Sequence, residues 1–182
     1  MHEITTPLTD EVVTTLRAGD RVYLSGVIYT ARDAAHARMA QALLAGEQLP
    51  FPVAGNVIYY VGPAPAKPGW AVGSAGPTTS GRMDVYTPEL LRLGLKGMIG
   101  KGSRSEEVKV ALREHKAVYF AATGGAAALL AKRVVRAKVI AYPDLGPEAI
   151  HEFVVDKLPL TVINDIYGGD LYSAGRQRYA RR

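Results

Sequence analysis

The sequence predicts an α/β domain built of layers. Runs rich in β-branched and aromatic residues alternate with helix-like runs along most of the 182 residues. A hydrophobic content of 48% with 21% charged residues is typical of a globular chain long enough to bury a core. No internal repeat or low-complexity segment interrupts the alternation. We therefore expect one domain over residues 1–172 and a basic tail over 173–182.

The composition excludes several classes of protein. The chain contains no cysteine, so it cannot build a disulfide framework or hold an iron–sulfur cluster by thiolates. It shows neither an export signal nor a run of about 18 apolar residues, so we expect a cytoplasmic protein without a membrane span. Much of the net charge of +5 comes from the arginines of the tail, so nucleic acid is not an expected partner. The tail is expected to be solvated or to bind a partner.

The first elements are expected to be a short helix and a long strand. Thr9 has the position of an N-cap before a helix over 10–17. Residues 21–29 have strand composition, with a bulge at Gly26.

A second helix is expected to carry the first cation of interest. Thr30 and Asp33 have the spacing of a capping box, which predicts a helix over 31–45. Arg32 would then lie in the first turn, where a cation opposes the helix dipole, so stability does not explain its position. An anionic ligand would explain it. His36 lies one turn further on the same face, where it would either contact that ligand or form a hydrogen bond nearby.

The remaining elements continue the alternation. Strands are expected over 56–61, 71–72, 96–99, 117–121, 137–142, 153–155 and 160–163. Helices are expected over 87–93, 103–115 and 126–135, with a helical turn at 147–150. The helix over 103–115 would start at a second capping box, formed by Ser103 and Glu106. The proline-rich segment 62–69 is expected to be a loop.

The stretch 73–84 has the composition of a binding site. It combines three glycines, a proline, the adjacent hydroxyls of residues 78–80 and the guanidinium of Arg82. Glycines let a backbone approach a ligand closely, and an arginine fork suits a carboxylate or a phosphate. Arg32 and Lys101 are also lone cations at strand-to-helix junctions. The three junctions together predict half of a site for a small polyanion such as a dicarboxylate. Ordinary turns with exposed cations are the alternative.

Other chemistries lack their motifs. The sequence contains no His-Glu-x-x-His, no Gly-x-Ser-x-Gly and no EF-hand loop, so neither a self-contained hydrolase nor a metal site is predicted. The run 123–125, Thr-Gly-Gly, precedes a helix and would either hold an anion or allow close helix–strand packing. No Walker lysine or dinucleotide pattern follows, so no nucleotide site is expected.

Five runs of the sequence together resemble one family. They are 19–26, 30–36, 73–84, 96–101 and 123–130, and the resemblance extends over roughly residues 9 to 172. The family is the β subunit, or C-terminal domain, of iron–sulfur (class I) fumarate hydratases and L(+)-tartrate dehydratases. The resemblance implies a swivelling β/β/α-type domain with a mixed sheet. It also implies a partner α subunit that holds a [4Fe–4S] cluster, in a hetero-oligomer such as α2β2.

The resemblance also implies roles for individual residues. Arg32, Arg82 and Lys101 would bind the carboxylates of the substrate, and Thr78 would be the catalytic residue that exchanges the substrate proton. Further possible site residues are His36, Thr79 and Gly81. A threonine hydroxyl has too high a pKa to act as a base unaided, so Thr78 would need a proton acceptor from the α subunit.

The expected function is therefore a subunit of a hydro-lyase, with reversible hydration of fumarate to L-malate as the first expectation. L(+)-tartrate dehydratase and a hydratase of a methylated dicarboxylate are alternatives within the family. A non-catalytic module that binds dicarboxylates or regulates a partner is the alternative of another class.

Overall fold

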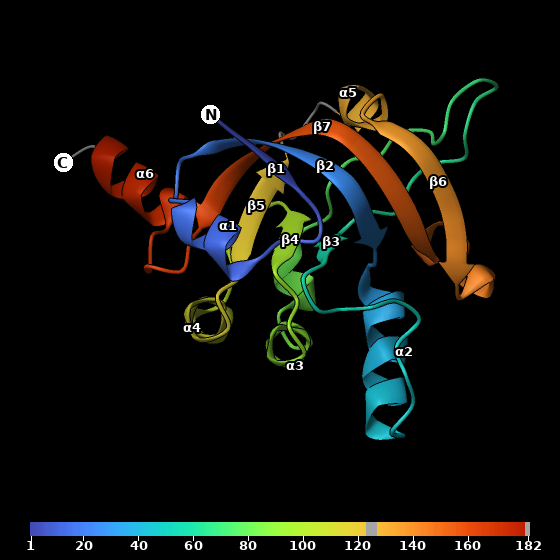
Figure 1. Ribbon diagram of the computed structural model, residues 1–182, viewed down its shortest axis with the longest axis horizontal. Coiled ribbons are helices and arrows are strands. Elements are labelled where there is room, and N and C mark those ends of the chain that lie inside the picture. The colour runs from blue at the N-terminus through green and yellow to red at the C-terminus, as the bar shows by residue number, and fades with distance from the viewer. Residues whose placement is uncertain (123–126, 181–182) are drawn as a thin grey trace.

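A computed structural model describes residues 1–122 and 127–180 of the chain (Figure 1). Seven strands form one mixed sheet in the order β1-β2-β3-β4-β5-β7-β6, and β2 pairs with β7 as well. The pairings β2–β3–β4–β5–β7–β2 therefore close into a ring. The predicted α/β layers and the mixed sheet are confirmed.

The elements have the following bounds. The strands are β1 (His2–Thr5), β2 (Arg21–Thr30), β3 (Val57–Tyr59), β4 (Gly97–Gly100), β5 (Val118–Ala122), β6 (Val134–Ala141) and β7 (Ile150–Asn164). The helices are α1 (Asp10–Thr15), α2 (Asp33–Leu44), α3 (Thr87–Arg92), α4 (Glu106–Glu114), α5 (Ala127–Ala131) and α6 (Leu171–Tyr179). Two 3-10 helices are η1 (Ser80–Met83) and η2 (Pro143–Glu148). None of the helices in the described ranges has the length and apolar character needed to cross a bilayer.

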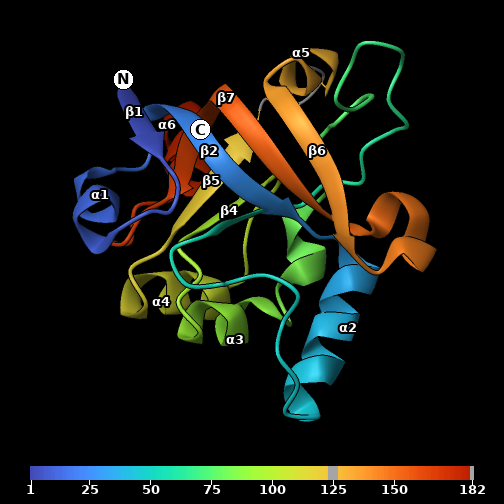
Figure 2. The same cartoon turned by 45° about the vertical axis from the view of Figure 1, so that its right-hand side comes forward.

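The strands separate two hydrophobic clusters because side chains alternate along each strand. In β3, Val57 and Tyr59 belong to the cluster inside the ring, and Ile58 belongs to the cluster beneath the helices. Figures 1 and 2 both show α2, α3 and α4 on that second side of the sheet. Burial on both faces explains why β3 and β4 are apolar throughout.

Several local predictions are confirmed. The Thr9 side chain accepts a hydrogen bond from the Val12 amide and caps α1. The pairing of β2 with β7 shifts register between Leu24 and Gly26, and Gly26 has a φ of 104°, which a glycine adopts without strain. A side chain at Gly26 would also place Cβ 2.5 Å from the Thr6 hydroxyl.

Both predicted capping boxes were wrong. The Thr30 hydroxyl accepts a hydrogen bond from the His151 amide at 3.0 Å, so it links β2 to β7 and leaves Arg32 as the N-cap of α2. Helix α4 begins later than expected, because Ser105 rather than Ser103 accepts a hydrogen bond from the Val108 amide. Tertiary partners thus decided between candidate caps.

Four other boundaries also differ from expectation. The runs 153–155 and 160–163 belong to one strand, β7, which antiparallel pairing with β2 keeps continuous. The helix expected to reach 135 ends at Ala131, since β6 begins at Val134, which pairs with Val155 of β7. Residues 71–72 form no strand, and the helical turn expected at 147–150 ends earlier, in η2.

The two ends of the chain contain elements that the sequence did not reveal. Strand β1 pairs in parallel with the first half of β2. Most of the expected tail lies in helix α6, which Asp170 caps by accepting hydrogen bonds from the amides of Tyr172 and Ser173. Helix α6 is therefore part of the folded chain up to Tyr179.

Candidate active site at the carboxyl edge of the parallel strands

The three predicted junctions meet at one edge of the sheet. Strands β2, β3 and β4 are parallel neighbours, so their carboxyl ends lie together at one edge of the sheet. Arg32 follows β2 and Lys101 follows β4. The Thr78 amide donates to the Tyr60 carbonyl at 2.7 Å, and the Lys101 amide donates to the Thr78 carbonyl at 3.2 Å. The stretch 73–84 is thereby joined to the ends of β3 and β4.

Two of the predicted arginines share one carboxylate. Nη2 of Arg82 lies 2.8 Å from Oδ2 of Asp33, and Nη2 of Arg32 lies 3.9 Å from the same oxygen. Asp33 is the first residue of α2, where the helix dipole favours a negative charge. The carboxylate of Asp33 therefore shows where an anion can lie between the two guanidinium groups.

Arg32 is more deeply buried than Arg82. Its side chain is 28% exposed, against 56% for Arg82, and its Nε lies 3.8 Å from Oε1 of Glu148. Gly62 makes room for it, since a Cβ there would lie 3.2 Å from both Cδ and Nη1 of Arg32. The buried Nε of Arg32 has no hydrogen-bond partner among the described residues. The donor is consequently available to a further acceptor.

The glycines near the site allow close packing of the chain against itself. A Cβ at Gly73 would lie 2.4 Å from the Pro65 carbonyl oxygen, and a Cβ at Gly100 would lie 1.9 Å from Oγ of Ser80. Gly81 differs, because the nearest atom to its Cβ would be 3.8 Å away, in Ser103. Close packing therefore requires glycine at positions 73 and 100. It does not explain why the exposed position 81 is a glycine.

The two adjacent threonines have different environments. Thr78 is half-buried, whereas Thr79 is exposed and forms a parallel bridge with Lys101. A Cβ added to Gly102 would lie 3.9 Å from Cγ2 of Thr79, so the Thr79 side chain lies over the loop that follows β4.

His36 is buried beneath Arg32. Its Nδ1 donates to the Arg32 carbonyl at 2.8 Å, so Nδ1 carries the proton of the neutral ring. Burial is the main reason that the pKa of His36 falls from 6.5 to about 4. His36 therefore supports the backbone of Arg32 as a neutral side chain.

This burial predicts a pH dependence of stability. Between pH 7.5 and 5 the unfolded chain protonates His36 and the folded chain does not, so the free energy of unfolding should fall by about 2 kcal/mol. His36→Gln should reduce this fall, leaving the smaller share of His151, whose pKa burial also lowers. Urea unfolding of both proteins at the two pH values measures the difference. If the free energy of unfolding of His36→Gln fell by the same amount between the two pH values, His36 would not be the residue responsible.

A buried ion pair at the site was not anticipated. Arg104 is 4% exposed, and its Nε donates to Oδ1 of Asp84 at 2.7 Å. In the sequence, Arg104 is a cation three residues after Lys101. The neighbouring residues give no signal that its side chain is buried. Asp33 was likewise noticed only as a capping residue.

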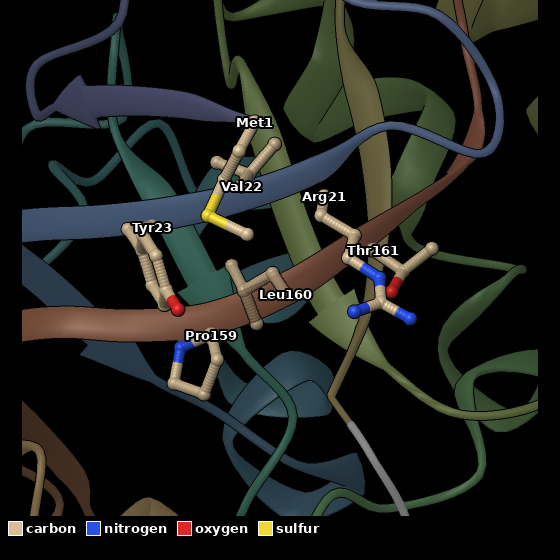
Figure 3. Close-up of a pocket in the computed structure, with 7 residues that line it drawn as sticks. All are labelled: Met1, Arg21, Val22, Tyr23, Pro159, Leu160 and Thr161. Carbon is tan, nitrogen blue, oxygen red and sulfur yellow. The ribbon is translucent and has the colours of Figure 1, made fainter.

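The hollow shown in Figure 3 lies elsewhere. It measures about 270 Å³ and is lined by Met1, Arg21, Val22, Tyr23, Pro159, Leu160 and Thr161. These residues lie near the start of β2, and the ten-residue strand separates them from Arg32 by roughly 30 Å. The hollow and the cation cluster are therefore separate features.

Thiolate ligands for an iron–sulfur cluster cannot come from this chain. It has no cysteine, and the described residues contain no group of three histidine, aspartate or glutamate side chains suited to a metal ion. The run 123–125, expected as an anion site or a packing element, lies outside the described residues.

The fold and the site define a layered α/β domain with a cluster of cations at the carboxyl edge of its parallel strands. The chain belongs to the fumarase C-terminal family, whose model, described as Fumarase C-terminus, matches residues 2–175.

Relatives of two kinds match the chain. One from Methanocaldococcus jannaschii, provisionally named L(+)-tartrate dehydratase subunit beta, is 41% identical over 91% of this chain and 88% of its own length. Fumarate hydratase 2 of Leishmania major is 40% identical over 85% of the chain, and the aerobic class I fumarate hydratase of Escherichia coli is 38% identical over 94%. The chain spans only 28% and 31% of these two fumarate hydratases.

Proposed function

We propose that this chain is the β subunit of an iron–sulfur-dependent hydro-lyase that acts on a small dicarboxylate, with fumarate hydratase as the first candidate. The observation that carries the proposal is the pair of arginines, Arg32 and Arg82, on one carboxylate beside Thr78 and Lys101. Membership of the fumarase C-terminal family supports it.

In this proposal, the substrate carboxylate takes the place of Asp33 on Arg82. The Arg82 side chain is more than half exposed, and ion pairs of that kind contribute about 0–1 kcal/mol, so a ligand can displace Asp33 at little cost. A displaced Asp33 stays near the N-terminus of α2, where the helix dipole favours it. Lys101, exposed on the neighbouring loop, binds the second carboxylate.

The cations also act on the reaction itself. Removing a proton next to a carboxylate places additional negative charge on that carboxylate in the transition state. Arg82 and Lys101 lie against the two carboxylates once substrate is bound, so they stabilise this added charge more than the charge of the bound substrate. Thr78 passes the proton between the substrate carbon and an acceptor on the partner, because a threonine hydroxyl is too weak a base to keep it.

The iron–sulfur cluster belongs to the partner in this proposal, since the chain supplies no thiolate. The partner is an α subunit of fumarase type, and the assembly is a cytoplasmic hetero-oligomer such as α2β2. When bound, the cluster would supply the Lewis acid for the hydroxyl group.

L(+)-tartrate dehydratase is the second candidate. The relative that bears this name is matched over 88% of its length, as expected for a separate subunit, whereas the fumarate hydratases are matched over about a third or less. Two carboxylates are common to both substrates, so the cations alone do not distinguish one substrate from the other.

A reconstitution experiment tests the proposal. The pure chain should fold and show no turnover of fumarate, L-malate or L(+)-tartrate, whereas the chain co-purified with an α subunit from the same organism should be active. Iron analysis of the pure chain should find no stoichiometric cluster. Turnover or a cluster in the pure chain would contradict the division of roles. A complex that binds succinate but converts none of the three substrates would favour a non-catalytic dicarboxylate-binding module.

A further inference from the structure

The residues that support the candidate site converge on one buried cation. The guanidinium of Arg104 forms an ion pair with Asp84 on one side and donates from Nη2 to the hydroxyls of Thr87 at 2.8 Å and Tyr60 at 3.2 Å. It also lies over the ring of Tyr119, 5.0 Å from the centroid.

Three of the four partners of Arg104 (Asp84, Tyr60 and Tyr119) also contact a site residue or its neighbour in the chain. Asp84 directly follows η1, the turn that carries Arg82, and its other oxygen accepts from the Ser105 amide at 2.7 Å. The carbonyl of Tyr60 holds the Thr78 amide. The hydroxyl of Tyr119 bonds Oγ of Ser80 at 2.7 Å and donates to the Gly102 carbonyl at 2.8 Å, beside Lys101.

The arrangement is costly as a purely stabilising device. A buried ion pair contributes little over apolar side chains of similar size, because both charges lose their hydration. Nη1 of Arg104 is buried without a hydrogen-bond partner in the described part of the chain, so the cation is not fully satisfied. What the pair does provide is a fixed geometry between η1 and the loop that follows β4.

We propose that Arg104 is a positioning residue. It holds the segment 78–84, which carries Thr78 and Arg82, against the loop after β4, which carries Lys101. It acts through Asp84, Tyr60 and Tyr119 and does not contact substrate. The inference rests on the proposed function for its kinetic consequence, but its structural consequence is independent of that function. Misplacement of catalytic groups by about 1 Å is enough to slow a reaction up to 100-fold.

The test removes the lock without leaving an unpaired charge. Arg104→Met combined with Asp84→Asn deletes both charges, and Arg104→Lys keeps the charge but loses the planar fork. Arg92→Met is the matched control, because Arg92 also pairs with a carboxylate, Glu89, but on an exposed face of α3. If the double variant does not fold, Arg104→Lys alone supplies the measurement.

Hydrogen exchange on the chain gives the first readout. Amides of 78–84 and 100–103 should exchange at least about 10-fold faster in the Arg104 variants, whereas amides of β5 and β7 should be unchanged. Equally faster exchange throughout the sheet would mean that Arg104 only stabilises the fold. Unchanged exchange at 78–84 would mean that Arg104 does not hold this segment in place. Either result would overturn the proposal.

Kinetics of the reconstituted complex give the second readout. We expect kcat to fall about 10- to 100-fold in the Arg104 variants and to remain at the wild-type value in Arg92→Met. In an Arg82→Met background the same Arg104 change should lower kcat by less than about 3-fold further, because the side chain that Arg104 positions is already absent. Full additivity would overturn the proposal. A wild-type complex without turnover would refute the proposed function alone, and hydrogen exchange would still decide the role of Arg104.

Discussion

Thr78→Val should abolish exchange of the substrate's methylene proton with deuterated solvent in the reconstituted complex. Valine keeps the shape of threonine and deletes only the hydroxyl. The contacts that hold Thr78, from its amide to Tyr60 and from Lys101 to its carbonyl, are made by the main chain and survive the change. Dicarboxylate binding should therefore persist. Proton exchange followed by NMR, with succinate binding measured by calorimetry, separates the two properties.

Thr79→Val is the matched control for this experiment. Thr79 is exposed and lies over the loop that follows β4, so loss of its hydroxyl should have a much smaller effect on exchange. The reverse ranking would assign the proton to Thr79. Equal and slight effects of both changes would show that the partner subunit handles the proton alone.

Arg82→Met should lower turnover about 100-fold or more while the complex still assembles. The loss is large because the guanidinium would bind a carboxylate whose charge grows in the transition state. Assembly should survive, since the Arg82 side chain is mostly exposed and its ion pair with Asp33 is weak. Arg32→Met should mainly raise KM. Steady-state kinetics on complexes of equal iron content measure both effects.

Arg38→Met supplies the comparison for the arginine variants. Arg38 lies on α2, is 38% exposed and pairs with Asp144, so its removal changes the same charge away from the site. Its kcat and KM should equal those of the wild type. Near-normal turnover of Arg82→Met would remove that residue from the proposed site, and an equal loss in Arg38→Met would point to net charge instead.

The sequence by itself determined the layers, the strands β2 to β5 and the two strand-to-helix junctions that carry Arg32 and Lys101. Those features depend on local signals, namely residue composition, glycines and prolines, which act within a few neighbouring residues. The loops after β2 and β4 were placed correctly because parallel strands direct their carboxyl ends to one edge. The resemblance supplied the candidate roles of Thr78, Arg32, Arg82 and Lys101.

Only the tertiary structure decided which polar groups meet. Thr30 has a capping pattern, but its hydroxyl accepts a hydrogen bond from His151 in β7. The runs 153–155 and 160–163, expected as two strands, are one strand because β2 pairs along it. Arg104 is buried because Asp84 and two tyrosines, distant in sequence, surround it. Such choices depend on contacts between residues that are distant in sequence, 20 apart for Arg104 and Asp84 and 121 apart for Thr30 and His151, which local propensity cannot register.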